Sequence, residues 1–260
     1  GNILKKLGRL DEAVKSYQKA LEISPDFPAL HNNLGNAFKE LGQLDDALKS
    51  YKDALSYNPD FPDSLSNLGI IYFKLGQLEK SVQFYEKAIK INPIFKEAYN
   101  NLGNAFKRLN QFDKAVEAYK KAIEINPNFF DAYNSLGLIL ATDSSLLHQA
   151  VESFEKAIDI NPNFAIAHNN LAHVFRDLNK PDDAIKSYQK AIKLNPEFYQ
   201  AHNNYGNLLA KGFNRLNDAV KSFRRAIEIK PDFAIAYNNL AHTLLDLNQL
   251  DEALQSYEMA

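Results

Sequence analysis

Apolar residues recur with helical spacing in two successive segments of a repeating unit. In residues 62–95, the inward positions of the first segment are Leu65, Leu68, Gly69, Tyr72 and Leu75. Those of the second segment are Leu78, Ser81, Tyr85, Ala88 and Ile91. Intervals of three and four residues place each set on one face of a helix. The unit is therefore predicted to be a helix A, a tight turn and a helix B.

Turn residues mark where these helices begin and end. Gly76 follows helix A and can adopt a left-handed conformation, and Asn110 and Asn248 stand at the same place in other units. The Asn92–Pro93 pair ends helix B, because a residue before proline avoids the helical region. Proline also stands at or near the start of three predicted helices, where its missing N–H costs nothing: Pro28, Pro62 and Pro181.

The unit repeats along the whole chain. Prolines that follow helix B are spaced by 34 or 35 residues: Pro25, Pro59, Pro93, Pro127, Pro162, Pro196 and Pro231. Repetition at this period predicts an all-α solenoid in which each repeat packs on its neighbours. One solenoid is expected over residues 1–260, with partial repeats at 1–27 and 234–260. The complete repeats are 28–61, 62–95, 96–129, 130–164, 165–198 and 199–233.

Small and aromatic residues occupy fixed positions of the repeat. Position 8 of helix A is usually glycine, as at Gly35, Gly69, Gly103, Gly137 and Gly206. Glycine inside a helix costs about 1 kcal/mol relative to alanine, so its recurrence predicts a close approach of helix backbones. Rings stand at one position of helix B: Tyr51, Tyr85, Tyr119, Phe154, Tyr188, Phe223 and Tyr257. We expect these rings to fill the core rather than to hold a cofactor.

Composition excludes several classes of function. The net charge of -2, from 30 basic and 32 acidic residues, argues against a nucleic-acid surface. The absence of cysteine excludes disulfides and thiolate metal sites. His31, His168 and His202 lie in separate repeats, too far apart to share a metal, so they are expected to be structural. We expect no cofactor and no metal. We also expect no membrane partner, because no apolar run is long enough to span a bilayer. The compartment stays open.

The pattern of Leu, Gly or Ala, Phe or Tyr, Ala, Tyr, Ala and Pro resembles the tetratricopeptide repeat (TPR) family across essentially the whole chain. Two copies depart from it by one extra residue in the A–B turn, within "ATDSSLLHQA" and "AKGFNRLNDA". A surface turn should absorb each residue at little cost. The resemblance implies a right-handed superhelix with helix A on its concave side.

Asparagine is concentrated on the face of helix A that folding does not require. Positions 2, 6, 9 and 13 lie opposite the apolar positions 4, 7 and 11 and should line the groove. Position 6 carries Asn33, Asn67, Asn101, Ser135, Asn170, Asn204 and Asn239. Position 5 carries Asn32, Ser66, Asn100, Asn134, Asn169, Asn203 and Asn238. Position 9 adds Asn36, Asn104, Asn207, His173 and His242, of which the histidines should titrate near pH 6.5.

Two interpretations of these asparagines remain open. An amide offers donors and an acceptor, which suit the alternating N–H and C=O groups of an extended peptide. Alternatively, the amides bond to neighbouring repeats and set the pitch of the solenoid, which we expect of one of the two columns at positions 5 and 6.

The motif "AYNNLGN" (98–104) is similar to repeats of the O-GlcNAc transferase family. That resemblance implies that position-6 asparagines hold a peptide backbone and that acids at position 2 select side chains. Asp63, Glu97 and Asp131 match those acids, whereas Ala29, Ile166, Gln200 and Ile235 do not. The lysines of a clamp for chaperone C-terminal carboxylates are missing from positions 2, 5 and 6, so that type of site is rejected.

The sequence therefore predicts a non-catalytic scaffold that binds an extended segment of another protein, of unknown identity, in its concave groove. A substrate-recruiting arm of a larger enzyme, such as a glycosyltransferase, is one alternative. Another is end-to-end self-association, because the ends at positions 8 and 27 of the repeat carry no polar capping helix.

Overall fold

The computed structural model describes residues 1–260 and contains sixteen α-helices and no strand. The A helices are α1 (Asn2–Lys6), α3 (Pro28–Glu40), α5 (Pro62–Lys74), α7 (Lys96–Arg108), α9 (Phe130–Leu140), α11 (Ala165–Asp177), α13 (Tyr199–Phe213) and α15 (Ala234–Asp246). The B helices are α2 (Leu10–Ile23), α4 (Leu44–Tyr57), α6 (Leu78–Ile91), α8 (Phe112–Ile125), α10 (Leu147–Ile160), α12 (Pro181–Leu194), α14 (Leu216–Ile229) and α16 (Leu250–Glu258). The predicted all-α solenoid is confirmed.

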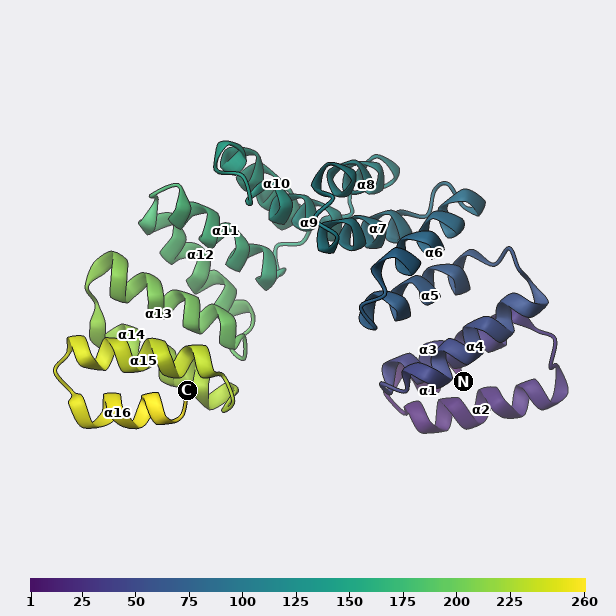
Figure 1. Ribbon diagram of the computed structural model, residues 1–260, viewed down its shortest axis with the longest axis horizontal. Coiled ribbons are helices and arrows are strands. Elements are labelled where there is room, and N and C mark those ends of the chain that lie inside the picture. Colours follow the sequence, from purple (N-terminus) through teal and green to yellow (C-terminus); the bar gives the residue numbers. More distant parts are fainter. The chain divides into compact units, whose positions relative to one another are not determined.

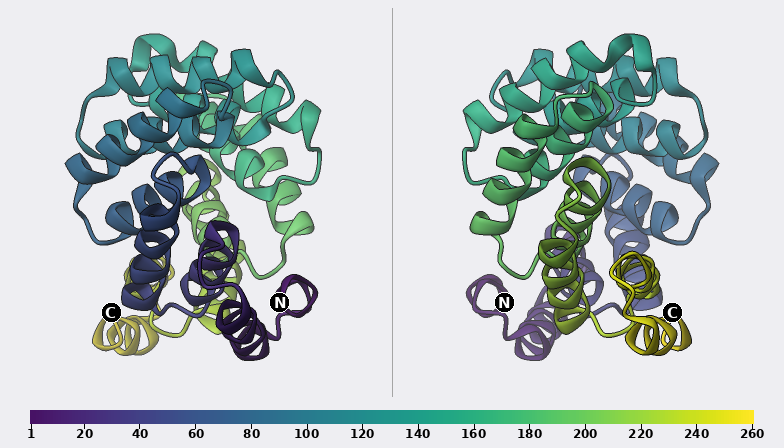
Figure 2. Two further views of the ribbon diagram at one scale, coloured as in Figure 1. Left: turned by 90° about the vertical axis from the view of Figure 1, so that its right-hand side faces the viewer. Right: turned by 90° about the vertical axis from the view of Figure 1, so that its left-hand side faces the viewer.

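The chain divides into two compact units, Gly1–Pro127 with α1–α8 and Asn128–Ala260 with α9–α16. Within each unit, each helix A packs on helix B of its own repeat and, after the first repeat of the unit, on helix B of the repeat before it, as α5 packs on α6 and α4. Figures 1 and 2 show each unit as a stack of helical hairpins. The single solenoid over 1–260 and its right-handed superhelix stay predictions.

The turn residues behave as the sequence predicts. The helices α3, α5, α7, α9, α11, α13 and α15 begin at the first residue of each repeat assigned from the sequence. Gly76, Asn110 and Asn248 have φ values of 73°, 57° and 59°, so all three adopt the left-handed conformation that ends helix A. Pro181 is the first residue of α12. Local sequence signals thus define the hairpins.

The two inserted residues are accommodated in different ways. After α9, a short 3₁₀ helix, η1 (Ser144–Leu146), precedes α10, and the Asp143 carboxylate accepts a hydrogen bond from the Ser145 N–H at 2.8 Å. After α13, which has 15 residues, Asn214 adopts a left-handed conformation with φ of 52°. Residues 142–145 and 214–215 are exposed, in agreement with the predicted tolerance of these turns.

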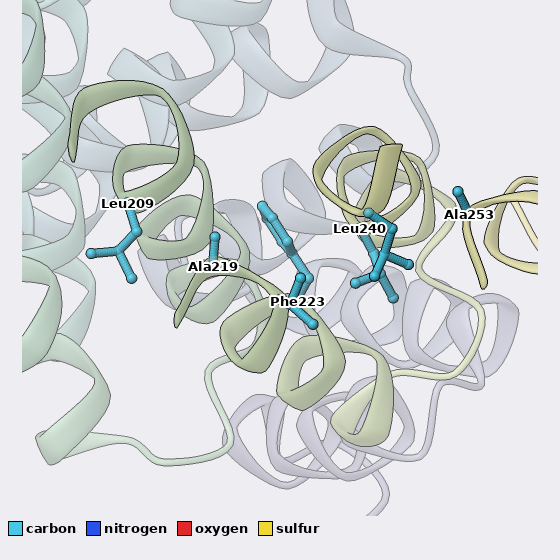
Figure 3. Close-up of a cluster of buried hydrophobic side chains, with 7 residues drawn as sticks. Leu209, Ala219, Phe223, Leu240 and Ala253 are labelled. Atoms are coloured by element: carbon cyan, nitrogen blue, oxygen red, sulfur yellow. The ribbon is translucent and has the colours of Figure 1, made fainter. Parts of the chain in front are cut away.

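The core is built where glycine of helix A meets the ring of helix B. A Cβ atom placed on Gly69 would lie 2.6 Å from Cε1 of Tyr85, which is a steric clash. Tyr85 itself is 2% exposed, so its ring cannot move into solvent. In the second unit, Phe223 of α14 packs with Leu209, Ala219, Leu240 and Ala253 (Figure 3). The predicted aromatic core is confirmed, and the group that closely approaches the glycine is the ring of helix B rather than a backbone.

None of the helices combines the length and the apolar composition that crossing a bilayer requires.

Candidate functional site

The side chains at positions 2, 5, 6, 9, 12 and 13 of the A helices form one surface, which we call the A-helix face. Its two asparagine columns differ in burial. Position-5 asparagines are buried, with 4–8% exposure at Asn32, Asn100, Asn134, Asn169 and Asn203. Position-6 asparagines are half-buried. The face is therefore not a uniform row of solvated amides.

Four of the five buried position-5 amides accept a hydrogen bond from position 6 of the next repeat. The exception is Asn100, whose oxygen has no partner because position 6 of the next repeat is Ser135. Asn67 Nδ2 donates to Asn32 Oδ1 at 3.0 Å in the first unit. In the second unit the donor–acceptor pairs are Asn170–Asn134 at 3.0 Å, Asn204–Asn169 at 3.2 Å and Asn239–Asn203 at 2.9 Å. Asn238, the position-5 residue of the last repeat, is exposed and donates only to the Ala234 carbonyl of its own helix. Burial of position 5 thus depends on the hairpin that follows.

In the second unit these bonds join into a continuous relay of six amides. Asn203 Nδ2 also donates to Asn204 Oδ1, at 3.5 Å, and Asn169 Nδ2 donates to Asn170 Oδ1 at 3.3 Å. The donors therefore run in one direction, through Asn239, Asn203, Asn204, Asn169, Asn170 and Asn134. Hydrogen bonds in a chain polarise one another and strengthen in a buried setting. In the second unit the buried position-5 amides therefore join neighbouring repeats, and the position-6 amides donate to them.

The position-6 amides of the first unit retain more hydrogen-bonding capacity. Asn33 and Asn101 make no hydrogen bond within the chain. For Asn101, position 5 of the preceding repeat is Ser66, so no asparagine stands there to accept its hydrogen bond. Asn67 keeps one N–H after donating to Asn32, whereas its oxygen accepts from Lys39 Nζ at 2.9 Å. Asn204 in the second unit uses its amide nitrogen twice, for Asn169 Oδ1 and for His173 Nε2 at 2.9 Å. Asn33 and Asn101 thus keep their full hydrogen-bonding capacity, whereas Asn204 has no donor left.

Position 9 is tied to helix B through its oxygen. Tyr51 Oη donates to Asn36 Oδ1 at 2.9 Å, and Tyr119 Oη donates to Asn104 Oδ1 at 2.8 Å. Both asparagines are half-buried and keep two N–H donors each. Asn207 stands opposite Phe223, which has no hydroxyl, and makes no hydrogen bond within the chain. The column therefore presents amide donors whose orientation the core tyrosines fix.

The histidines divide into two groups. The Nε2 atoms of His31, His168 and His202 lie 2.7, 3.3 and 2.9 Å from the carbonyl oxygens of Pro25, Pro162 and Pro196, so their predicted structural role is confirmed. His173 was expected to titrate near pH 6.5, but burial lowers its pKa. His242 lies 2.9 Å from Tyr257 Oη through its Nδ1.

The position-2 acids lie near the start of the A helices, and their settings differ. Asp63 is exposed on α5. Glu97 lies 3.6 Å from the ammonium of Lys96. Asp131 is half-buried on α9, and burial raises the pKa of its carboxyl group. Asp63 is thus the acid most accessible to a cationic ligand side chain.

Lysines at position 12 also belong to this face, although the sequence pattern did not lead us to predict them as site residues. Lys39 and Lys107 are half-buried, and burial lowers the pKa of both ammonium groups. The recurrence of lysine at one position, in Lys5, Lys39 and Lys107, is the signal that could have found them.

A cavity of about 610 Å³ lies outside the A-helix face. It lies between α6, α7 and α8, with Tyr99, Leu102 and Phe106 of positions 4, 7 and 11 as its floor. No group of histidine and acidic side chains is arranged to hold a metal ion.

Family comparisons agree with the repeat assignment. Sequence models described as TPR repeat match residues 1–42, 35–76 and 69–110. Models described as tetratricopeptide repeat match residues 97–129, 118–152, 165–198, 199–233 and 222–255. No curated protein matches the chain in a full-length sequence comparison.

Solved structures share the fold. A chain of the APC/C hetero-tetramer Cut9–Hcn1 is 17% identical with a TM-score of 0.79 over 93% of this chain and 47% of that one. This chain therefore spans about half the length of that relative. A tetratricopeptide repeat protein from Parabacteroides merdae is 22% identical with a TM-score of 0.72, over 94% and 95% of the two chains. YrrB, described as a TPR protein with an unusual peptide-binding site, is 23% identical with a TM-score of 0.54, over 73% and 97%.

Proposed function

The chain belongs to the tetratricopeptide repeat family, and from this premise we propose that its A-helix face binds an extended segment of a partner protein, chiefly in the unit Gly1–Pro127. Proteins of this family are generally scaffolds that bind protein or peptide partners, and this chain is such a scaffold. The proposal adds the face, the conformation of the ligand and the residues that hold it.

The proposal rests mainly on amide groups of the A-helix face that make no hydrogen bond within the chain. In the first unit, Asn33 and Asn101 are uncommitted, and Asn36 and Asn104 each keep two N–H donors. Half-buried amides without partners are favourable sites for a peptide, because its backbone supplies one acceptor and one donor per residue.

The repeat spacing suits an extended backbone. Neighbouring A helices lie roughly 10 Å apart, and an extended chain advances about 3.3 Å per residue. One amide therefore meets about every third residue of the ligand, and a segment of about 12 residues spans the four A helices of the unit. Each bond contributes about 0.5–1.5 kcal/mol, against an association cost of about 4–15 kcal/mol. We expect micromolar affinity and loose sequence preference.

Substitutions of two asparagines at position 6 allow the effect on peptide binding and the effect on stability to be measured separately. The variant Asn101→Ala removes an amide that bonds to nothing within the chain, so it should weaken peptide binding about fivefold without lowering stability. The variant Asn204→Ala removes an amide of the relay, so it should lower stability and leave binding to the first unit nearly unchanged.

The measurement is fluorescence anisotropy on the full chain, with peptides of about 12 residues selected from a random library. Urea unfolding of each variant provides the stability control. Unchanged affinity in Asn101→Ala and in the double variant Asn36→Ala/Asn104→Ala would refute the proposal.

A further inference from the structure

Two lysines of the A-helix face lie half-buried without an acidic partner. Lys39 of α3 donates one hydrogen bond, to the amide oxygen of Asn67 at 2.9 Å, and keeps two N–H donors. Lys107 of α7 forms no ion pair, and burial alone lowers the pKa of its ammonium. Removing an ammonium from water without a counter-charge is unfavourable, so each lysine would gain from an incoming anion.

The surroundings of these lysines are basic. Lys74 and Arg108, at position 13 of α5 and α7, are exposed beside them on the last turns of the A helices. The Arg108 guanidinium lies 4.7 Å from the centre of the Phe73 ring and donates to the Phe73 carbonyl oxygen at 3.0 Å. Burial is the main reason that the pKa of Lys39 is lowered; the charges of Lys5 and Lys74 lower it further, and the carboxylate of Glu40 opposes them.

One acid, Glu40 at position 13 of α3, lies among these cations. Its carboxylate is 2.9 Å from the ammonium of Lys5, with which it pairs, and its charge also acts on Lys39. Asp63 and Glu97 stand at position 2, ten residues before position 12, which corresponds to about 15 Å along a helix axis. In the first unit, the edge of this face at positions 12 and 13 therefore carries several cations and one acid, Glu40, whereas position 2 carries Asp63 and Glu97.

The helix dipole accounts for only part of this pattern. It favours cations in the last turn of any helix, and exposed lysines such as Lys74 satisfy that preference. It does not favour half-burial of an ammonium, which loses hydration. At position 12 the second unit has Ala141, Ala210, Leu245 and one cation, Arg176, which is exposed and paired with Asp177.

We propose that Lys39 and Lys107 form a binding site for carboxylate side chains of an acidic extended segment in a partner protein. This inference rests on the proposed function, since it assigns a side-chain preference to the segment that lies along the A-helix face. Lys74 and Arg108 add charge at the rim, and the Asn67 oxygen keeps the Lys39 ammonium in place.

The repeat spacing sets the spacing of the two acids in the ligand. Lys39 and Lys107 are 68 residues apart, which is two repeats of 34. With roughly 10 Å per repeat, the two ammonium groups are about 20 Å apart. An extended peptide covers that distance in about six residues. The preferred ligand therefore carries two glutamates or aspartates about six residues apart.

The test uses synthetic alanine–serine peptides of about 14 residues and the full chain. One peptide carries two glutamates six residues apart, one carries them two residues apart, and one carries glutamine in place of both. The variants Lys39→Met and Lys107→Met remove the ammonium groups and keep the length of the stems. Lys39→Arg retains the charge, and Lys49→Met/Lys52→Met removes two exposed lysines of α4 as the matched control.

We expect the six-residue spacing to bind about tenfold tighter than the glutamine peptide, with the two-residue spacing in between. Both glutamates together give this tenfold gain, so each single Lys→Met change should weaken the six-spaced peptide about threefold and the double variant about tenfold, with the glutamine peptide unchanged. Lys39→Arg and the α4 control should bind normally. Urea unfolding should show that the methionine variants are at least as stable as the parent, because a poorly hydrated charge is removed.

Three results would overturn the inference. Equal affinity for glutamate and glutamine peptides, both lost in Asn101→Ala, would refute the acidic preference and leave the proposed function intact. Equal losses in the α4 control and in Lys39→Met/Lys107→Met would show attraction to net charge rather than to this site. Failure of every peptide to bind would overturn the proposed function together with the inference.

Discussion

Replacing Asn169 by alanine should reveal how much the amide relay stabilises the second unit. Asn169 is 7% exposed and has two relay partners: it accepts from Asn204 at 3.2 Å and donates to Asn170 at 3.3 Å. A hydrogen bond of this kind contributes about 1 kcal/mol, and each buried partner left unpaired costs about 1–3 kcal/mol. Both partners are half-buried, so water satisfies part of that need. We expect a loss of about 2–3 kcal/mol.

The same substitution at Asn238 is the matched control. Asn238 occupies the same position of its helix, but it is exposed and bonds only to the Ala234 carbonyl of its own helix. Alanine is the better helix former by about 0.6 kcal/mol at both sites, so this contribution cancels in the comparison. Asn238→Ala should therefore be neutral or slightly stabilising.

The assay is urea unfolding followed by circular dichroism at 222 nm, combined with amide hydrogen exchange in α11 and α13. Repeat proteins lose stability interface by interface, so exchange should accelerate first in the two helices that Asn169 connects. A double-mutant cycle between Asn169 and Asn204 should give a coupling of about 1 kcal/mol. Equal unfolding midpoints for Asn169→Ala and Asn238→Ala, or a coupling near zero, would refute the structural role of the relay.

Three further predictions concern other parts of the molecule. Burial lowers the pKa of His168, His173 and His202 in the folded state. Below the ordinary histidine pKa of about 6.5, the unfolded state therefore binds more protons than the folded state. Stability should fall as pH drops through that value and level off below the folded pKa values. Unfolding at pH 7.5 and 5.5 should show that the triple glutamine variant of these histidines loses less stability than a variant of the exposed His148. Gly69→Ala should cost about 1–2 kcal/mol in urea unfolding despite its better helix propensity, because its Cβ would meet Tyr85 at 2.6 Å; a gain in stability would contradict the tight contact. Leu250 and Leu254 of α16 are 60% and 62% exposed, so light scattering should show mass rising with concentration, and Leu250→Lys/Leu254→Lys should abolish the rise; a constant monomer mass in the parent would exclude association through this face.

The repeat architecture could be predicted almost completely because its signals are local. Gly76 and Asn110 end their helices through backbone conformations that these residue types allow. Gly69 and Tyr85 reveal a packing contact because a missing Cβ and a large ring recur together. Each such feature depends on residues of one hairpin, whose spacing is visible in one copy of the sequence and is checked by the next copy.

The candidate site could be predicted only in part because its residues depend on neighbouring hairpins. Asn32 and Asn33 are adjacent in sequence and chemically identical, yet the hairpin that follows buries the first and leaves the second half-exposed. The burial of Lys39 depends in the same way on Asn67 of the next repeat. Helical periodicity defines the face of a helix, but it does not show which side of that face the next hairpin covers.

Stability and binding compete for the same amides, and this competition separates the two units. An amide nitrogen has two hydrogens, and Asn204 uses both inside the relay. In the first unit, Ser66 replaces the amide that would have engaged Asn101, so the relay is interrupted there and Asn101 is left for a ligand. A Ser66→Asn substitution should therefore extend the relay by one bond, raise stability by about 1 kcal/mol and weaken peptide binding at the same time. A variant that gains stability without losing affinity for the peptide would show that structure and ligand do not share this amide.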